Sequence, residues 1–285
     1  MNGLISVLKP PGMTSGGVVA RAKRIFGCRA GHAGTLDPEA AGVLPVMLGK
    51  GTRLFDYLVD KEKTYVAELV TGLETDTQDV HGRVTGTSGV LSAGQVEAVL
   101  PRFVGTVWQV PPMVSALKRG GEKLVDLARQ GIEVPRDPRP VSIDAVRLVR
   151  DMGQGRFLLR VDCGRGTYIR TLCHDIGRAC GAAACMGMLI RTRSGAFTQE
   201  MSVPVEEMDE SGILPMDLPL GHLPRVEVAG AAERFLRNGV PLEKREISQV
   251  PGEDQPVRLY LGDRFCGIGR WRGGALRTEV LLLET

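Results

Sequence analysis

We predict an α+β fold for this chain, because strand-like and helix-like patterns follow one another along it. Residues 63–71, 141–149 and 157–163 alternate between two sets of side chains, which is typical of strands. Residues 14–26 and 92–103 instead repeat apolar side chains every three to four positions, as helices do. At 285 residues the chain is longer than a typical single domain. We therefore expect one large domain and one small domain.

The first half of the chain supplies short strands and helices in turn. A buried strand over residues 3–8 must end at Lys9-Pro10-Pro11-Gly12, since proline interrupts both helices and strand ladders. A helix follows, capped by Thr14 or Ser15. Its apolar stripe consists of Val18, Val19, Ala22, Ile25 and Phe26. Further along we expect strands at 43–48, 63–71 and 107–110, and helices at 52–59 and 92–103.

In the second half, two strands at 141–149 and 157–163 form a hairpin around a turn at 151–155. A helix from Thr167 to about Cys180 and a strand at 188–192 come next. The stretch 203–224 is acidic and rich in proline, which predicts a short helix and a linker. We therefore place a large domain at residues 1–220 and a small one at 221–285. The small domain should contain a helix at 231–238 and strands at 257–260, 265–271 and 276–283.

Charge is distributed unevenly along the chain. The net charge is only +3, yet residues 101–170 hold 13 Lys or Arg against 7 Asp or Glu. A locally positive surface of this kind suits a polyanionic partner, although a run of solvated charges would look the same in the sequence. The chain as a whole has the ordinary balance of a globular protein, with 43% hydrophobic and 24% charged residues.

Several classes of protein are disfavoured. No apolar run approaches the length of a membrane span, and Pro10 and Pro11 come too early for a signal peptide, so we expect a cytoplasmic protein. The six cysteines form no Cys-x-x-Cys pair and lack zinc-ligand spacing; Cys173 and Cys180 are expected to be core thiols. The aspartates near Asp76 lack the register of a calcium loop, and no nucleotide-binding glycine motif occurs.

The most distinctive stretch is residues 31–44, which read GHAGTLDPEAAGVL. Three glycines surround one carboxylate, Asp37, and Pro38 directly after it prevents a helix. The backbone of such a loop can approach a ligand closely while it presents an acid. A solvated turn is the simpler interpretation of an Asp-Pro pair between glycines.

The wider string decides between these interpretations. It resembles, nearly letter for letter, the catalytic loop of the TruB family of bacterial tRNA pseudouridine synthases, which isomerise the uridine at position 55 in the T loop of tRNA. The matching residues are His32, Gly34, Thr35, Leu36, Asp37, Pro38, Ala41, Gly42, Val43, Leu44 and Pro45. Four further motifs match the family: Lys9-Pro10-x-Gly12, Lys63-Thr64-Tyr65, Pro111 to Lys118, and Gly166-Thr167-Tyr168-Ile169-Arg170.

The resemblance implies a fold, a reaction and a partner. The fold is α+β: a large mixed, mainly antiparallel central sheet flanked by helices (the pseudouridine synthase fold), plus a small β-rich C-terminal domain of the RNA-binding PUA type. The reaction uses no external reactant, so neither a cofactor nor a metal is expected. The expected partner is the T-arm stem-loop of tRNA, recognised by base flipping. We expect a monomer with no obligate protein partner.

The resemblance also assigns roles to four residues. Asp37 is the expected nucleophile or base, and Arg170 is its cationic partner. Asp79 is expected to brace Arg170 through a charge-assisted pair, and Tyr65 to stack on the target uracil and help to move a proton. Arg170 falls in the first turn of its helix, where the helix dipole disfavours a cation by roughly 0.3–1 kcal/mol, so its placement itself indicates a function. The residues leave open whether Asp37 adds to C1′, adds to C6 or stabilises a glycal intermediate.

Further residues are expected to contact the RNA. In the family, the histidine at His32 enters the T loop and occupies the space of the extruded nucleotide, although a loop histidine bonded to backbone is the simpler interpretation. Residues 111–138 form a glycine-hinged basic arm that can close over a phosphate backbone. The expected RNA contacts are Lys9, His32, Lys118, Arg119, Lys123, Tyr168, Leu189 and Arg191.

Three other functions remain compatible with the residues. A non-catalytic RNA-binding protein could use the arm and the C-terminal domain without chemistry. A glycoside or nucleoside hydrolase could use Asp37 and Asp79 as a carboxylate pair, although this would not explain the basic arm. RNA-guided archaeal and eukaryotic relatives share the scaffold and need partner proteins.

Overall fold

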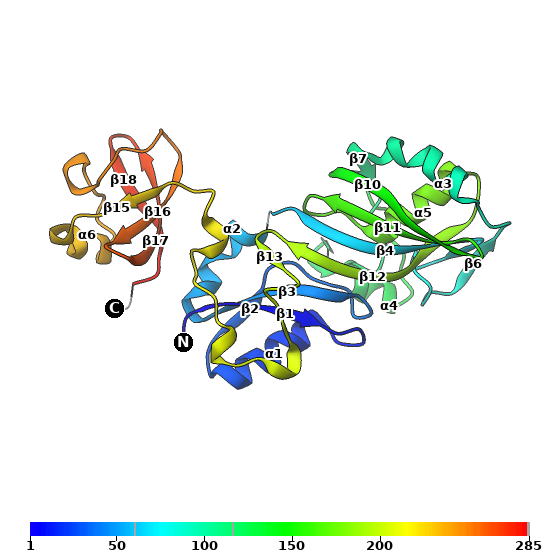
Figure 1. Ribbon diagram of the computed structural model, residues 1–285, viewed down its shortest axis with the longest axis horizontal. Coiled ribbons are helices and arrows are strands. Elements are labelled where there is room, and N and C mark those ends of the chain that lie inside the picture. The colour runs from blue at the N-terminus through cyan, green and yellow to red at the C-terminus, as the bar shows by residue number, and fades with distance from the viewer. Residues whose placement is uncertain (60, 116, 284–285) are drawn as a thin grey trace.

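The computed structural model describes residues 1–59, 61–115 and 117–283. Its centre is a ten-stranded sheet in the order β14-β1-β3-β12-β4-β11-β10-β7, with β2 beside β3 and β13 beside β12 (Figure 1). Most neighbouring strands are antiparallel, and the pairs β1/β14 and β3/β12 are parallel. These findings confirm the expected α+β class and the mixed, mainly antiparallel sheet. The strands in that order are β14 (Val203–Pro204), β1 (Gly3–Lys9), β3 (Ala41–Leu48), β12 (Ala184–Ser194), β4 (Lys63–Thr71), β11 (Arg156–Cys163), β10 (Arg139–Gly153) and β7 (Gly105–Gln109). The two additional strands are β2 (Ala30–His32) and β13 (Phe197–Thr198).

Two halves of the sheet meet where β3 and β12 run in parallel. Ile190 pairs with Ala41, and Arg191 pairs with Gly42. Gly42 has a φ of +108°, and a Cβ atom there would lie 2.2 Å from the carbonyl oxygen of Arg191, so only glycine fits. The chain between β2 and β3 is therefore held at the middle of the sheet. We call this segment, residues 33–40, the aspartate loop.

The first helix, α1 (Ser15–Phe26), begins and packs largely as the sequence predicts. The Thr14 side chain accepts a hydrogen bond of 2.9 Å from the backbone N–H of Gly17, which confirms the cap. The apolar stripe is buried except for Ile25, which is 41% exposed. Ile25 was expected to belong to the buried stripe, and this expectation is wrong, because in the last turn of the helix only Phe26 is buried.

The helix α5 (Ile169–Ala179) carries Arg170 and packs against β12. Thr167 does not cap it, because its hydroxyl donates instead to the carbonyls of Ser142 and Gly164. Tyr168 is the cap residue, and its side chain makes no capping bond. Cys173 on this helix is fully buried, as expected, whereas Cys180, which directly follows the helix, is only half-buried.

Smaller elements complete both domains. A hairpin of β5 (Leu73–Thr75) and β6 (Val84–Thr87) pairs in a small sheet of its own, and so do β8 (Lys118–Arg119) and β9 (Glu122–Lys123). No helix in the described part of the chain is long and apolar enough to cross a membrane. The other helices are α2 (Phe55–Val59), α3 (Ala93–Val99), α4 (Leu124–Arg129) and α6 (Glu233–Arg237), and the 3-10 turns are η1 (Gly49–Leu54), η2 (Leu100–Phe103), η3 (Val205–Glu207), η4 (Glu210–Gly212), η5 (Leu218–Leu220), η6 (Gly230–Ala232) and η7 (Lys244–Glu246).

A separate four-stranded sheet follows the linker and lies at the opposite end of the molecule from α3 and β7 (Figure 1). Its strands include the three that the sequence predicts. Ile268 of this sheet and Leu282, the residue directly after its last strand, share a buried cluster with Leu58 of α2. The small sheet is therefore packed against the large domain at α2. Its strands are β15 (Arg225–Glu227), β16 (Pro256–Leu261), β17 (Arg264–Arg272) and β18 (Ala275–Leu281).

Candidate active site

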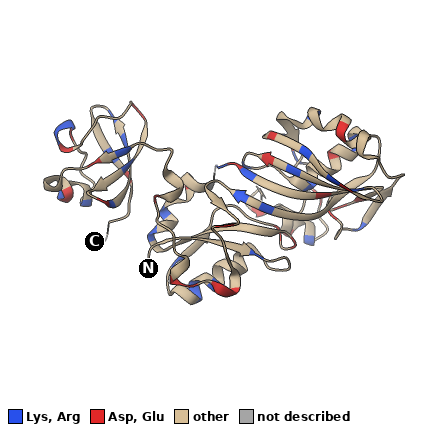
Figure 2. Ribbon diagram, viewed as in Figure 1, with Lys and Arg blue, Asp and Glu red and all other residues tan. Residues whose placement is uncertain are grey.

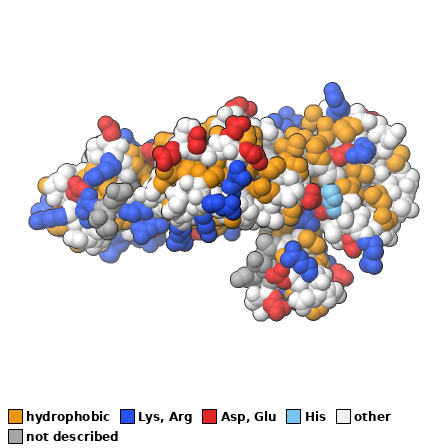
Figure 3. Space-filling view, turned by 90° about the horizontal axis from the view of Figure 1, so that it is seen from below, with side chains coloured by type: hydrophobic (Ala, Val, Ile, Leu, Met, Phe, Trp, Pro, Cys, Tyr) orange, Lys and Arg blue, Asp and Glu red, His pale blue; other side chains and the backbone are white. Residues whose placement is uncertain are grey.

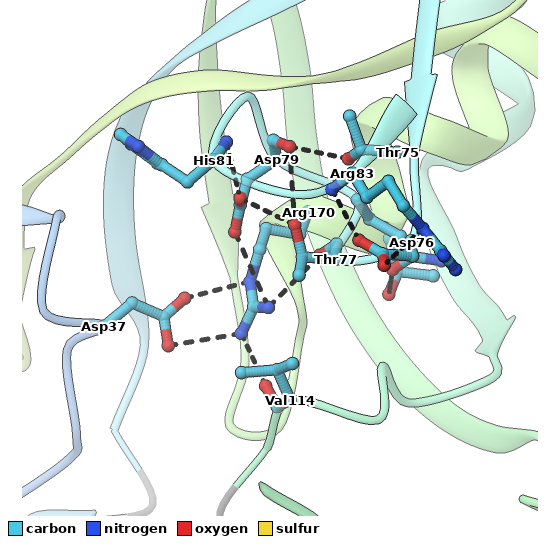
Figure 4. Close-up of polar contacts among 11 residues, drawn as sticks. Asp37, Thr75, Asp76, Thr77, Asp79, His81, Arg83, Val114 and Arg170 are labelled. Carbon is cyan, nitrogen blue, oxygen red and sulfur yellow. Dashed lines mark hydrogen bonds and ion pairs between the residues drawn. The ribbon is translucent and has the colours of Figure 1, made fainter. Parts of the chain in front are cut away.

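Asp37 and Arg170, which lie far apart in the sequence, form an ion pair with two contacts (Figure 4). Arg170 Nε lies 3.0 Å from Asp37 Oδ2, and Arg170 Nη2 donates to Asp37 Oδ1 at 3.2 Å. This two-point contact fixes the direction of the carboxylate, because a guanidinium is planar and rigid. The Arg170 side chain is 4% exposed, whereas that of Asp37 is 42% exposed. The acid is thus held from behind and remains open to a ligand.

Three other groups hold the Arg170 guanidinium. The carbonyl of Val114 accepts from Nη2 at 2.8 Å and that of Thr77 from Nη1 at 3.2 Å, while Asp79 Oδ2 lies 3.8 Å from Nη1. Asp79 is fixed in turn by the Thr77 hydroxyl at 2.8 Å and the His81 backbone N–H at 3.0 Å (Figure 4). These carboxylates and carbonyls offset the unfavourable helix dipole at Arg170. The structure therefore brings Asp79 and Arg170 together, as the sequence predicts.

A cavity of about 320 Å³ opens beside the ion pair. Asp37, Arg170, Tyr65 and Leu189 all line it, and its volume lies in the range of small-ligand sites. Tyr65 is on β4 and is 7% exposed. Burial raises the pKa of the Tyr65 phenol, so the ring is uncharged at neutral pH. An acid, a cation and an aromatic ring from three distant segments therefore surround one hollow.

Comparison with known proteins identifies the family. The model for the N-terminal domain of TruB family pseudouridylate synthases matches residues 23–169, and the model for the C-terminal domain of tRNA pseudouridylate synthase B matches residues 170–217. A protein named tRNA pseudouridine synthase B from Heliobacterium mobile is 48% identical over 95% of this chain and 90% of its own. One from Azoarcus sp. (strain BH72) is 40% identical over 99% and 95%. The chain belongs to the TruB family.

Solved structures extend this likeness over nearly the whole chain. A Cbf5-Nop10-Gar1 complex contains a chain that is 30% identical, with a TM-score of 0.75, and the match covers 98% of this chain and 84% of that one. An H/ACA RNP bound to a substrate RNA containing 2′-deoxyuridine contains one that is 27% identical, with a TM-score of 0.76, over 99% and 85%. The TruB-family chain therefore shares both its large sheet and its C-terminal sheet with solved proteins.

Lys9 supports the aspartate loop, and its burial favours this role over the expected contact with RNA. Its side chain is 1% exposed, and Nζ donates to the carbonyls of Pro10, Met13 and Pro38 at 2.8, 2.6 and 2.8 Å. Burial lowers the pKa of the Lys9 ammonium to about 8. An ammonium with all three donors used inside the protein has none left for a phosphate.

Arg191 likewise supports the loop, and because it also lines the cavity, its expected contact with RNA stays a prediction. The side chain is fully buried. It donates to the carbonyls of Val43 at 2.8 Å, Gly34 at 3.0 Å and Thr35 at 3.5 Å. The central position of β12 in the sheet causes this burial. The sequence contained a signal for the burial of Arg191, because the arginine lies within a predicted strand of mostly apolar residues.

Three other expected contacts do lie at the cavity. His32 lines it, and burial followed by the nearby Arg191 charge lowers the pKa of its imidazole, so the ring is neutral at pH 7. Within the described residues, the buried Nδ1 of His32 has no hydrogen-bond partner, so the simpler interpretation of a ring bonded to backbone finds no support at that atom. Tyr168 and Leu189 also line the cavity. Burial raises the pKa of the Tyr168 phenol.

The basic arm at residues 111–138 is a hairpin followed by α4, and Figure 3 shows the segment around α4 projecting from the body of the molecule. Gly120 and Gly121 turn the hairpin with φ values of +59° and +94°. Arg119 is exposed, whereas the side chains of Lys118 and Lys123 lie outside what the structure describes. The base of the arm reaches the site through the Val114 carbonyl on Arg170.

Two residues at the site were missed by the sequence predictions. Gln109 holds the Tyr168 backbone from both sides, accepting from its N–H at 2.9 Å and donating to its carbonyl at 3.2 Å. A lone amide in an apolar strand was the available signal. Phe55 lines the cavity, and no local pattern distinguished it from other exposed helix residues. In the described part of the chain, no group of three or more His, Cys, Asp or Glu could hold a metal ion.

Proposed function

We propose that this protein isomerises uridine 55 in the T loop of tRNA to pseudouridine. The observation that carries the proposal is the Asp37–Arg170 pair at the wall of a cavity large enough for one nucleobase, with Tyr65 beside it. Membership of the TruB family supports the reaction. The names of the relatives, tRNA pseudouridine synthase B, support tRNA as the substrate.

The proposed reaction is an internal rearrangement. The bond between C1′ of the ribose and N1 of the uracil breaks, and a bond between C1′ and C5 forms. C5 loses its proton and N1 gains one, so atoms and electrons balance without any co-reactant. The protein must therefore supply a carboxylate near the sugar and the base, a means of aiming it, and a pocket that excludes water.

Asp37 is the group that we assign to the reacting centre, because its carboxylate is open to the cavity. Arg170 keeps it aimed, since both contacts come from one rigid, buried guanidinium. Asp79 holds that guanidinium from the other side, at 3.8 Å. In this assignment Asp79 is a positioning residue, and only Asp37 acts on the nucleoside.

Tyr65 is assigned to hold the target base flat by stacking. Its raised pKa keeps the phenol protonated, which favours the stacking role over acceptance of a proton. A base can enter a cavity at this depth only after it leaves its own stack, so the proposal includes base flipping. His32, at the same cavity with a neutral ring, suits the space that the extruded nucleotide leaves in the loop.

The rest of the RNA is assigned to the arm and the C-terminal sheet. Lys and Arg occur on several strands of the large sheet and on the small sheet (Figure 2). Arg119, with Lys118 and Lys123, would contact phosphates and add affinity without sequence information. We propose that the protein acts on the T arm of tRNA in the cytoplasm, as a monomer and without an obligate partner, and that residues 221–285 serve as a PUA-type RNA-binding domain.

Tritium release tests the proposed function. Unmodified tRNA labelled with tritium at C5 of its uridines is incubated with the purified chain alone. We expect one tritium released per tRNA, because only the isomerase displaces that hydrogen, and none from tRNA in which uridine 55 is replaced by cytidine. The variant Asp37→Asn should bind this tRNA nearly as well and release no tritium.

Each alternative gives a different result in this experiment. Free uracil as a product would indicate a hydrolase, and binding without tritium release would indicate an RNA-binding protein. Activity that appears only after a partner protein and a guide RNA are added would contradict the proposed independence. Substantial turnover by Asp37→Asn would remove Asp37 from the mechanism.

A further inference from the structure

Phe55 is an exposed aromatic residue at the cavity that the proposed reaction does not use. It is the first residue of α2, it lines the same cavity as Asp37 and Tyr65, and it is 40% exposed. Tyr65, in contrast, is 7% exposed. The two rings therefore differ in depth, with Tyr65 inside the cavity and Phe55 at its rim.

The C-terminal domain holds α2 through the side chain of Tyr57, two residues after Phe55. The Tyr57 hydroxyl donates to Glu279 Oε2 at 2.6 Å, and Arg270 Nε donates to Glu279 Oε1 at 2.6 Å. Burial raises the pKa of Tyr57 to about 12, so it stays a hydrogen-bond donor at neutral pH. Side chains two positions apart on a helix do not share a face, so Phe55 and Tyr57 leave α2 on different sides. Figure 1 shows α2 between the large sheet and the small one.

Extrusion of one nucleotide breaks its stacking contacts with the bases beside it. Aromatic side chains replace such a contact in RNA-binding sites, and they tolerate any base because every base has a flat π face. A base joined to the extruded one by a single phosphate remains near the rim of the cavity. An exposed ring at this rim is therefore placed to receive it.

We propose that Phe55 stacks on the base next to the target uridine, and that the C-terminal domain holds this ring in place through Tyr57 and Glu279. The proposal rests on the proposed function, since it needs an extruded nucleotide in the cavity. It adds a positioning residue, and it gives the C-terminal domain a part in arranging the active site.

Fluorescence of 2-aminopurine tests the stacking. The probe replaces the nucleotide directly before or directly after the target in a T-arm stem-loop, and Asp37→Asn serves as the parent protein so that the RNA stays unmodified. We expect the parent to quench the probe at one of the two positions. Adding Phe55→Ala should remove the quenching and weaken binding roughly 5- to 150-fold, whereas Phe55→Trp should preserve both.

A matched control is Ile25→Ala on α1, because Ile25 is 41% exposed and does not line the cavity. It should change neither quenching nor affinity. Unchanged quenching with Phe55→Ala, or an equal loss with Ile25→Ala, would overturn the stacking proposal. A failure of the stacking proposal can be told apart from a failure of the proposed function, because the quenching experiment measures binding and does not require turnover. Tritium release by the unaltered protein tests the proposed function. If no tritium is released, the stacking proposal is overturned as well.

The link to the C-terminal domain has its own test. Tyr57→Phe keeps the ring and removes only the hydrogen bond to Glu279. We expect it to lower kcat/KM a few-fold when Phe55 is present and to have no further effect in the Phe55→Ala variant, because both changes act through one ring. The same loss in both backgrounds would show that the domain acts independently of Phe55.

Discussion

Lys9 Nζ donates a hydrogen bond of 2.8 Å to the carbonyl of Pro38, the residue that directly follows Asp37. Arg191 bonds the other parts of the same loop, at the carbonyls of Gly34 and Thr35. Two buried cations thus hold the backbone on which the acid is carried. The rigidity of this loop comes from side chains below it, and the acid itself is left free to meet a ligand.

Replacement of Lys9 by methionine tests whether it supports the loop or contacts RNA. We expect Lys9→Met to lower kcat roughly 10- to 100-fold, because the backbone beside Asp37 loses a bond and small misplacements of a reacting group are costly. The salt dependence of tRNA affinity should not change. Single-turnover tritium release and binding at several salt concentrations measure the two quantities, with the exposed Lys23→Met on α1 as the control. A shallower salt slope for Lys9→Met would restore the phosphate contact.

Arg170→Lys retains the positive charge but loses the two-point contact with Asp37. We expect kcat to fall by about 10²- to 10³-fold while tRNA affinity changes little, because a point charge does not aim the carboxylate. Rapid-mixing turnover and filter binding give the two values, and thermal unfolding checks that the variant folds. Equal losses of rate and affinity would indicate that Arg170 contacts the RNA.

The arm can be tested through its charges. Neutralisation of Lys118, Arg119 and Lys123 together should reduce the slope of log affinity against log salt by roughly 2 to 3, since each lost phosphate contact removes about one unit. The matched control neutralises Lys23, Arg24 and Arg29, three exposed cations near α1. If the control flattens the slope and the arm variant does not, the phosphates lie on the other side of the molecule.

His174 gives the fold a pH-dependent contribution. Its Nδ1 lies 3.2 Å from Asp175 and its Nε2 lies 3.1 Å from Glu74 on β5, and the hydrogen bond to Asp175, ahead of that to Glu74, raises the pKa of His174 above its usual 6.5. A raised pKa stabilises the folded state fully below pH 6.5, and this stabilisation is lost as the pH rises through the folded value. We expect His174→Gln to cost about 1 kcal/mol near pH 5.5 and less at pH 8.5, measured by urea unfolding. A difference that does not vary with pH would contradict this.

The strands and helices were predictable because their patterns are local. The strand at Lys63–Thr71 and the cap at Thr14 each depend on a few neighbouring residues, and the structure has both. The candidate acid was also accessible, because the string around Asp37 resembles the catalytic loop of the TruB family. Thr167 shows the limit of local capping rules. Its hydroxyl donates to the carbonyls of Ser142 and Gly164, so it does not cap the helix that follows.

The sequence alone therefore determined where the longer strands run, which loop presents an acid, and to which family the chain belongs. The tertiary structure decided which side chains are buried: it buried the cations Lys9 and Arg191 under the loop and left the aromatic ring of Phe55 exposed at the rim. Burial of a side chain depends on the strands and loops that surround it in space, and those neighbours come from distant parts of the chain. A charge in the sequence therefore predicts that a partner exists, and the fold decides whether the partner is a phosphate or a backbone carbonyl.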